Sequence, residues 1–110
     1  MDYEESVLFN SPIPERLKVA RKRKGVSQKT LGVRVGMDES SASPRMNQYE
    51  KGRHTPDIQT LRLIAKELDV PLNYFFCEDE ISAKLACLIY KINDEEKKKL
   101  VSLLIELQEK

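Results

Sequence analysis

Hydrogen-bonding side chains gather in one short stretch near the middle of the chain. The spacing of Met46 and Tyr49 predicts that both face a core if the stretch is helical, which leaves polar side chains on the exposed side. The exposed candidates are Ser43, Arg45, Asn47 and Gln48. Amide and guanidinium groups form matched hydrogen-bond pairs with adenine and guanine in the major groove of DNA, which is wide enough to admit a helix. We therefore interpret this stretch as a candidate base-reading surface.

The sequence does not indicate catalysis. It holds a single histidine, His54, and neither a glycine-rich phosphate loop nor a nucleophile with a recognisable base. Cys77 and Cys87 lie far from His54, without the spacing of metal ligands, and their apolar neighbours are typical of core cysteines. We predict no enzymatic activity, no metal and no cofactor, and we find no sign of a separate effector pocket.

Positive charge is concentrated around the candidate surface. The net charge is only +1, but residues 13–56 hold eleven Lys and Arg against four Asp and Glu, whereas the segments on both sides are net acidic. A basic segment on a less basic body suits a polyanion such as DNA, although a solvated helix face accounts for the charge about equally well. The chain has no apolar run of the ~20 residues that span a bilayer, and its acidic start is unlike a signal peptide. We expect a cytoplasmic protein that does not contact membranes.

The elements that position this surface are predicted to be helices only. After an arm over residues 1–12, Pro14 is placed to begin a first helix, with Ile13 just outside it, and Gly25 to end it. Ser27 is a candidate N-cap for a second helix over residues 28–35, followed by Gly36. The pair Ser43–Pro44 then predicts the start of a third helix that continues to about residue 51.

Two further segments complete a predicted five-helix domain over residues 13–77. Asp57 caps a fourth helix, and Pro71 opens a short fifth segment. The apolar face of the fourth helix consists of Ile58, Leu61, Ile64, Ala65 and Leu68. The second and third helices must cross closely, and this crossing requires a small residue. Gly32, which follows the core residue Leu31, meets that requirement.

Residues 78–110 predict two amphipathic helices divided at Asn93–Asp94. We define their apolar stripe as the eight residues Ile81, Leu85, Leu88, Ile89, Leu100, Leu103, Leu104 and Leu107. The five-helix domain is complete without this stripe, so the stripe needs another partner, and a second copy of the chain is the simplest one. A different protein would satisfy the stripe equally well, as in an antitoxin or adaptor.

Residues 13–76 resemble the XRE-type helix-turn-helix domains of phage repressors and Cro proteins. The similarity is carried by the segments RLKVARKRKG, VSQKTLGVRVG and RMNQYEKGRHTPDIQTLRLIAKELDVPLNYF. The turn after Gly36 is about four residues longer than the usual spacing of the family. A register shifted by four residues buries Met46 and Tyr49, whereas the ungapped register would bury Arg45, and we adopt the shifted one.

The resemblance implies an all-α, repressor-like fold that binds double-stranded DNA sequence-specifically and regulates transcription, most simply as a repressor. It also implies a base-reading role for the four polar residues defined above and an ion pair between Arg21 and Glu50. The phosphate contacts that it implies are Arg21, Gln28, Lys29, Lys51 and Arg53. A dimer of such domains should recognise an inverted repeat.

Overall fold

The computed structural model describes residues 10–109, which form six α-helices and one 3-10 helix and contain no strand. In chain order the elements are α2 (Ile13–Lys24), α3 (Gln28–Arg34), α4 (Glu39–Glu50), α5 (Ile58–Leu68), η1 (Leu72–Phe76), α6 (Glu80–Lys91) and α7 (Asp94–Gln108). The predicted all-α fold, five short helical segments followed by two amphipathic helices, is confirmed. Most of the predicted arm over residues 1–12 lies outside the described residues.

The caps that the sequence indicated are present at most helix ends. Gly25 ends α2 in the left-handed conformation, and the Ser27 side chain accepts a hydrogen bond from the backbone N–H of Thr30 at the start of α3. The Asp57 carboxylate accepts the backbone N–H of Thr60 at the start of α5, a bond that lowers its pKa. These caps fix the residue at which α2 ends and the residues at which α3 and α5 begin.

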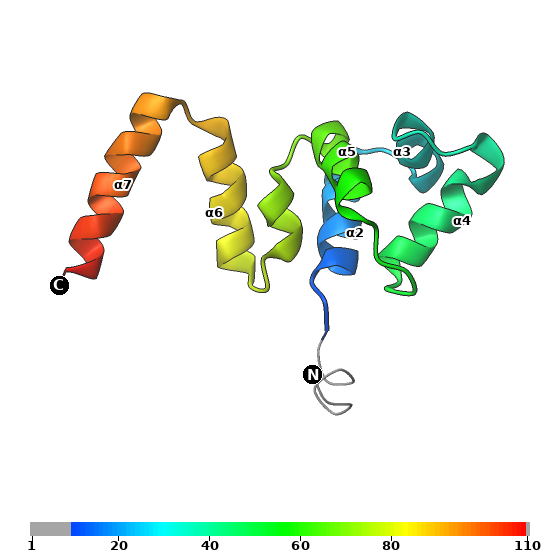
Figure 1. Cartoon of the computed structure of the whole chain (residues 1–110), viewed down its shortest axis with the longest axis horizontal. Coiled ribbons are helices and arrows are strands. Elements are labelled where there is room, and N and C mark those ends of the chain that lie inside the picture. The colour runs from blue at the N-terminus through cyan, green and yellow to red at the C-terminus, as the bar shows by residue number, and fades with distance from the viewer. Residues whose placement is uncertain (1–9, 110) are drawn as a thin grey trace.

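A single apolar core holds the first five segments together. α2 lies in the middle and packs against α4, α5 and η1, while α3 packs mainly against α4 (Figure 1). The largest fully buried side chains are Leu17, Leu31, Met46, Leu61, Ile64 and Phe75, which come from each of these five segments. The buried side chains of α3 and α4 therefore attach both helices to the core, and the opposite side of α4 is left at the surface.

Two boundary predictions need correction. Ile13 is the first residue of α2 and is buried, although it was expected just outside the helix. Ile58 was expected on the buried face of α5 but is 55% exposed. It is the first residue of α5, and the apolar face of the helix becomes covered only from Leu61 onward.

The prediction for the start of the third helix was wrong. α4 begins at Glu39, with Asp38 as its N-cap residue, rather than at the Ser43–Pro44 pair. The four extra residues of the long turn therefore form an additional helical turn, which lengthens α4 by about 6 Å. One turn returns the helix to nearly the same orientation, so Ala42, Met46 and Tyr49 share one buried face. Burial of Met46 and Tyr49 confirms the shifted register.

Pro44 lies inside α4, where proline normally disrupts a helix. It has no N–H to donate to the carbonyl of Ser40, one turn earlier, but Ser40 is exposed and that carbonyl can bond to water instead. Only one turn precedes Pro44, and its backbone is already tightened by a hydrogen bond from the Ser41 N–H to the Asp38 carbonyl, 3.0 Å long. The short first turn therefore accommodates the ring without breaking the helix.

The two C-terminal helices lie at the opposite end of the molecule from α4 (Figure 1). α6 packs against η1 and buries only two alanines, Ala83 and Ala86, whereas α7 buries no residue. α7 begins with a capping box in which Asn93 and Glu96 exchange side-chain and backbone hydrogen bonds. Among the described helices, none has both the length and the apolar character needed to cross a membrane.

α3 and α4 approach each other closely where they cross at Gly32 and Ala42. A Cβ atom added to Gly32 would lie 2.7 Å from the Cβ of Ala42 and 3.1 Å from both its Cα and its carbonyl oxygen. Because two of these atoms belong to the backbone, a side-chain rotation cannot relieve the clash. Gly32 therefore sets the distance between α3 and α4.

We expect Gly32→Ala to lower the free energy of unfolding by about 1–2 kcal/mol. The gain in helix propensity, about 1 kcal/mol, is smaller than the roughly 1–3 kcal/mol that overpacking costs. Urea denaturation measures the change. Adding Ala42→Gly should recover part of the loss, because it removes the nearest of the three clashing atoms. A Gly32→Ala protein as stable as the unmodified chain would contradict this assignment.

Candidate nucleic-acid interface

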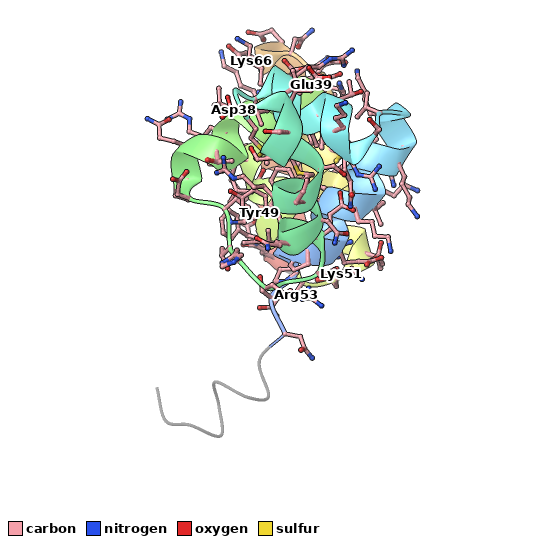
Figure 2. All side chains as sticks on the ribbon, turned by 90° about the vertical axis from the view of Figure 1, so that its right-hand side faces the viewer. Asp38, Glu39, Tyr49, Lys51, Arg53 and Lys66 are labelled. Carbon is pink, nitrogen blue, oxygen red and sulfur yellow. The ribbon has the colours of Figure 1, made fainter. Side chains whose placement is uncertain are left out.

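α4 is the most prominent surface element at its end of the molecule. Figure 2 shows it facing the viewer, from Asp38 and Glu39 at one end to Lys51 and Arg53 just beyond the other. The helical spacing places Ser40, Pro44, Gln48 and Lys51 opposite the buried face. We call these four residues the outer face of α4. Ser40 and Pro44 were not among the predicted site residues, because the sequence placed the start of the helix too late.

The earlier signal for the start of α4 was Asp38 followed by Glu39. An aspartate in the N-cap position and an acidic residue in the first turn are both favourable at a helix N-terminus. The Ser43–Pro44 signal obscured it. The outer face thus extends one turn further toward the N-terminus than the predicted base-reading surface.

The predicted base-reading residues do not all lie on the outer face. Gln48 lies on it, whereas Arg45 lies to one side, where it lines a polar hollow with Gln48, His54 and Thr55. Ser43, Asn47 and Gln48 are all partly buried, whereas Arg45 is exposed. The four candidates therefore span the outer face and both of its margins.

A polar cluster of four side chains joins α2, α3 and α4 beside this surface. Arg21 donates to both carboxylate oxygens of Glu50, through Nε at 2.5 Å and Nη2 at 3.0 Å, and through Nη1 to the carbonyl of Val26 at 3.0 Å. Gln28 donates through Nε2 to Oδ1 of Asn47 at 3.2 Å and to Oε1 of Glu50 at 3.1 Å. We call Arg21, Gln28, Asn47 and Glu50 the polar cluster.

Two residues that were predicted to contact phosphate are used inside this cluster. The side chain of Arg21 is 11% exposed and that of Glu50 only 4%, so the pair is largely withdrawn from water. Both amide hydrogens of Gln28 are matched by the acceptors on Asn47 and Glu50. The predicted Arg21–Glu50 pair is thus present, and Arg21 directs three of its five N–H donors, and Gln28 both of its amide hydrogens, to groups within the protein.

The cluster also determines which hydrogen-bonding group of Asn47 remains available to a DNA base. Its carbonyl oxygen accepts from Gln28, so the amide group Nδ2 is left to donate. Adenine requires a donor and an acceptor from one amide, whereas the N7 and O6 atoms of guanine accept hydrogen bonds only. The hydrogen bond therefore favours Asn47 as a donor and leaves Gln48 as the amide with both groups available.

The remaining predicted phosphate contacts are accessible. Lys51 and Arg53 are exposed just after α4, in a turn where Gly52 has a left-handed conformation. Lys29 on α3 pairs with Glu39 at 3.1 Å, but both side chains are more than half exposed. Such an exposed pair contributes little stability, so Lys29 can exchange its partner for a phosphate at low cost.

The described part of the chain contains no candidate metal centre. No group of three or more His, Cys, Asp or Glu in residues 10–109 is arranged to hold a metal ion. Cys77 and Cys87 are partly buried free thiols at the edge of the core.

Comparisons with known proteins agree with this geometry. A family model described as helix-turn-helix matches residues 17–75. A crystal structure of the transcriptional regulator BswR is similar to this chain, with a TM-score of 0.79 and 45% sequence identity. The similarity covers 86% of this chain and 93% of that one. No curated protein sequence matches the chain.

We expect Glu50→Ala to destabilise the protein by about 3 kcal/mol, because it leaves the guanidinium of Arg21 buried without its anion. The double variant Arg21→Met, Glu50→Leu should lose less than Glu50→Ala alone, since it leaves no unpaired charge. The exposed ion pair between Lys29 and Glu39 supplies the matched control. Glu39→Ala should change the free energy of unfolding by less than about 1 kcal/mol. Equal losses for Glu39→Ala and Glu50→Ala in urea denaturation would show that burial does not distinguish the two pairs.

Proposed function

The chain belongs to the helix-turn-helix family of DNA-binding regulators, and we propose that it binds operator DNA sequence-specifically as a dimeric repressor. The observation that carries this proposal is the outer face of α4, a polar helix surface held rigidly by the buried crossing at Gly32 and by the polar cluster. A rigid exposed helix fits the major groove. A protein bound there excludes other proteins from the same DNA, which is the mechanism we propose for repression.

The proposed contacts fall into two classes. Lys51, Arg53 and Lys29 bind phosphates and fix the position of the protein on the duplex without reading sequence. Gln48 and Asn47 read bases, and Ser43 and Arg45 flank them. Ser40 extends the reading surface by the additional turn of α4. This division is supported by exposure for the cations and by the helical spacing for the readers.

The apolar stripe supports the proposed dimer. All of its residues on α6 and three of its four on α7 are exposed, Ile81 by 74%, and only Leu100 is partly covered. Large apolar side chains exposed in this number along two helices mark an interaction site. It lies at the far end of the long axis from α4 (Figure 1), so two copies joined there would leave both α4 helices free to meet DNA.

Phosphate and base contacts should respond differently to mutation. We expect Lys51→Ala and Arg53→Ala each to weaken binding to all DNA sequences alike and to reduce the slope of log K against log salt by about 0.9, because each removes one phosphate contact. Gln48→Ala should leave that slope unchanged and reduce discrimination at one base pair by about 1–3 kcal/mol. Titrations of operator and random DNA at several salt concentrations measure both effects. If Gln48→Ala and Lys51→Ala gave the same pattern, the two-class assignment would fail.

A charge placed in the stripe should separate the dimer. We expect Leu104→Asp to give a monomeric mass at micromolar concentration and to weaken binding to an inverted repeat far more than binding to a half-site. Ser102→Asp introduces the same charge on α7 outside the stripe and serves as the control. A monomeric mass for the unmodified chain, together with capture of a different protein through α7, would favour the antitoxin or adaptor role instead.

A further inference from the structure

Two adjoining hollows lie along the seam between α2 and α6, away from the proposed DNA surface. The larger has a volume of about 430 Å³, which is within the range of small-molecule sites, and the smaller about 220 Å³. Arg23 and Cys87 line both hollows, so the two adjoin along one seam. The seam is open because α6 turns alanines, Ala83 and Ala86, toward the domain, and these side chains are too short to fill the space.

The larger hollow combines apolar walls with positive charge. Val19, Ala83, Cys87 and Leu88 contribute apolar surface, whereas Arg16, Arg23 and Lys84 contribute three cations against the single carboxylate of Glu80. Burial raises the pKa of the Cys87 thiol and of the Tyr74 phenol, which also lines the hollow, so both groups stay neutral at pH 7. The chemistry of the walls thus suits an anion attached to an apolar body.

Arg16 is the feature that suggests a ligand. It is 4% exposed, and it is the one charged residue among the buried residues of the described chain. Nε donates to the carbonyl of Cys77 at 2.9 Å and Nη1 to Oε1 of Glu80 at 2.8 Å, and the guanidinium lies 6.0 Å from the centroid of the Tyr74 ring. The Glu80 side chain is 87% exposed, so its carboxylate can move into water when another anion takes its place on the buried guanidinium of Arg16.

We propose that this seam binds a small amphipathic carboxylate. Its carboxylate group takes the place of Glu80 on Arg16 and is also paired by Arg23 and Lys84, while its apolar body lies against Val19, Ala83 and Leu88. Binding at this site does not depend on the proposed DNA-binding function. Glu80 is the first residue of α6, so its release removes one contact between α2 and the helix that bears half of the apolar stripe.

Octanoate added to the full chain in the absence of DNA tests the proposal. We expect saturable binding by calorimetry, with NMR shift changes centred on Val19, Ala83 and Leu88. Octyltrimethylammonium, whose alkyl tail is one carbon longer and whose charge is opposite, should not bind. No saturable binding of octanoate, equal binding of the cation, or shift changes confined to α7 would each overturn the proposal.

Two exposed cations on the same helix provide a matched pair of variants. Arg23 lines both hollows, whereas Lys22, its neighbour on α2, lines neither. Arg23→Gln should weaken octanoate binding by about tenfold, the loss expected for one charge-assisted contact, and Lys22→Gln should leave it unchanged. Both substitutions lie at the surface, so both proteins should fold, which circular dichroism verifies. Equal weakening by the two variants would mean that octanoate senses only the net charge of the protein.

Discussion

The arrangement of the candidate interface depends on the close crossing of α3 and α4 at Gly32 and Ala42. At this separation even one added methyl group would meet backbone atoms. The crossing fixes the distance between the two helices but does not fix the rotation of α4 about its own axis. That rotation is set by the burial of Met46 and Tyr49 on one side and by the polar cluster on the other.

The polar cluster shows why a buried ion pair suits this position. Replacing such a pair by apolar residues is often neutral or even favourable for stability, so stability alone does not explain it. Arg21 and Glu50 join α2 to the end of α4, and Gln28 connects the same carboxylate to Asn47. Hydrogen bonds have directional requirements that apolar contacts lack, so the cluster specifies one rotation of α4 and one orientation of the Asn47 amide.

Local signals in the sequence predicted the fold well, and they failed where two such signals competed. Gly25, Ser27, Asp57 and Asn93 each mark a helix end through a bond to a near neighbour in the chain, which a sequence displays directly. The start of α4 was missed because a serine followed by proline outweighed Asp38. The Arg21–Glu50 pair was predicted from the family resemblance, but the place of Gln28 in the cluster was not, because its amide meets acceptors 19 and 22 residues away and only the folded chain shows which donors are already used.

α6 carries both small and large apolar side chains, and the two kinds face different surfaces. Its alanines approach the domain closely enough to hold the helix but leave the seam beside α2 unfilled, while its larger apolar residues point away and form the stripe. Leu88 belongs to both surfaces, since it lines the larger hollow and is also 54% exposed. An occupant of the hollow and a second copy of the chain on the stripe would therefore contact the same side chain. Because Leu88 is shared, the proposed ligand and the proposed second copy of the chain would be coupled through the position of α6.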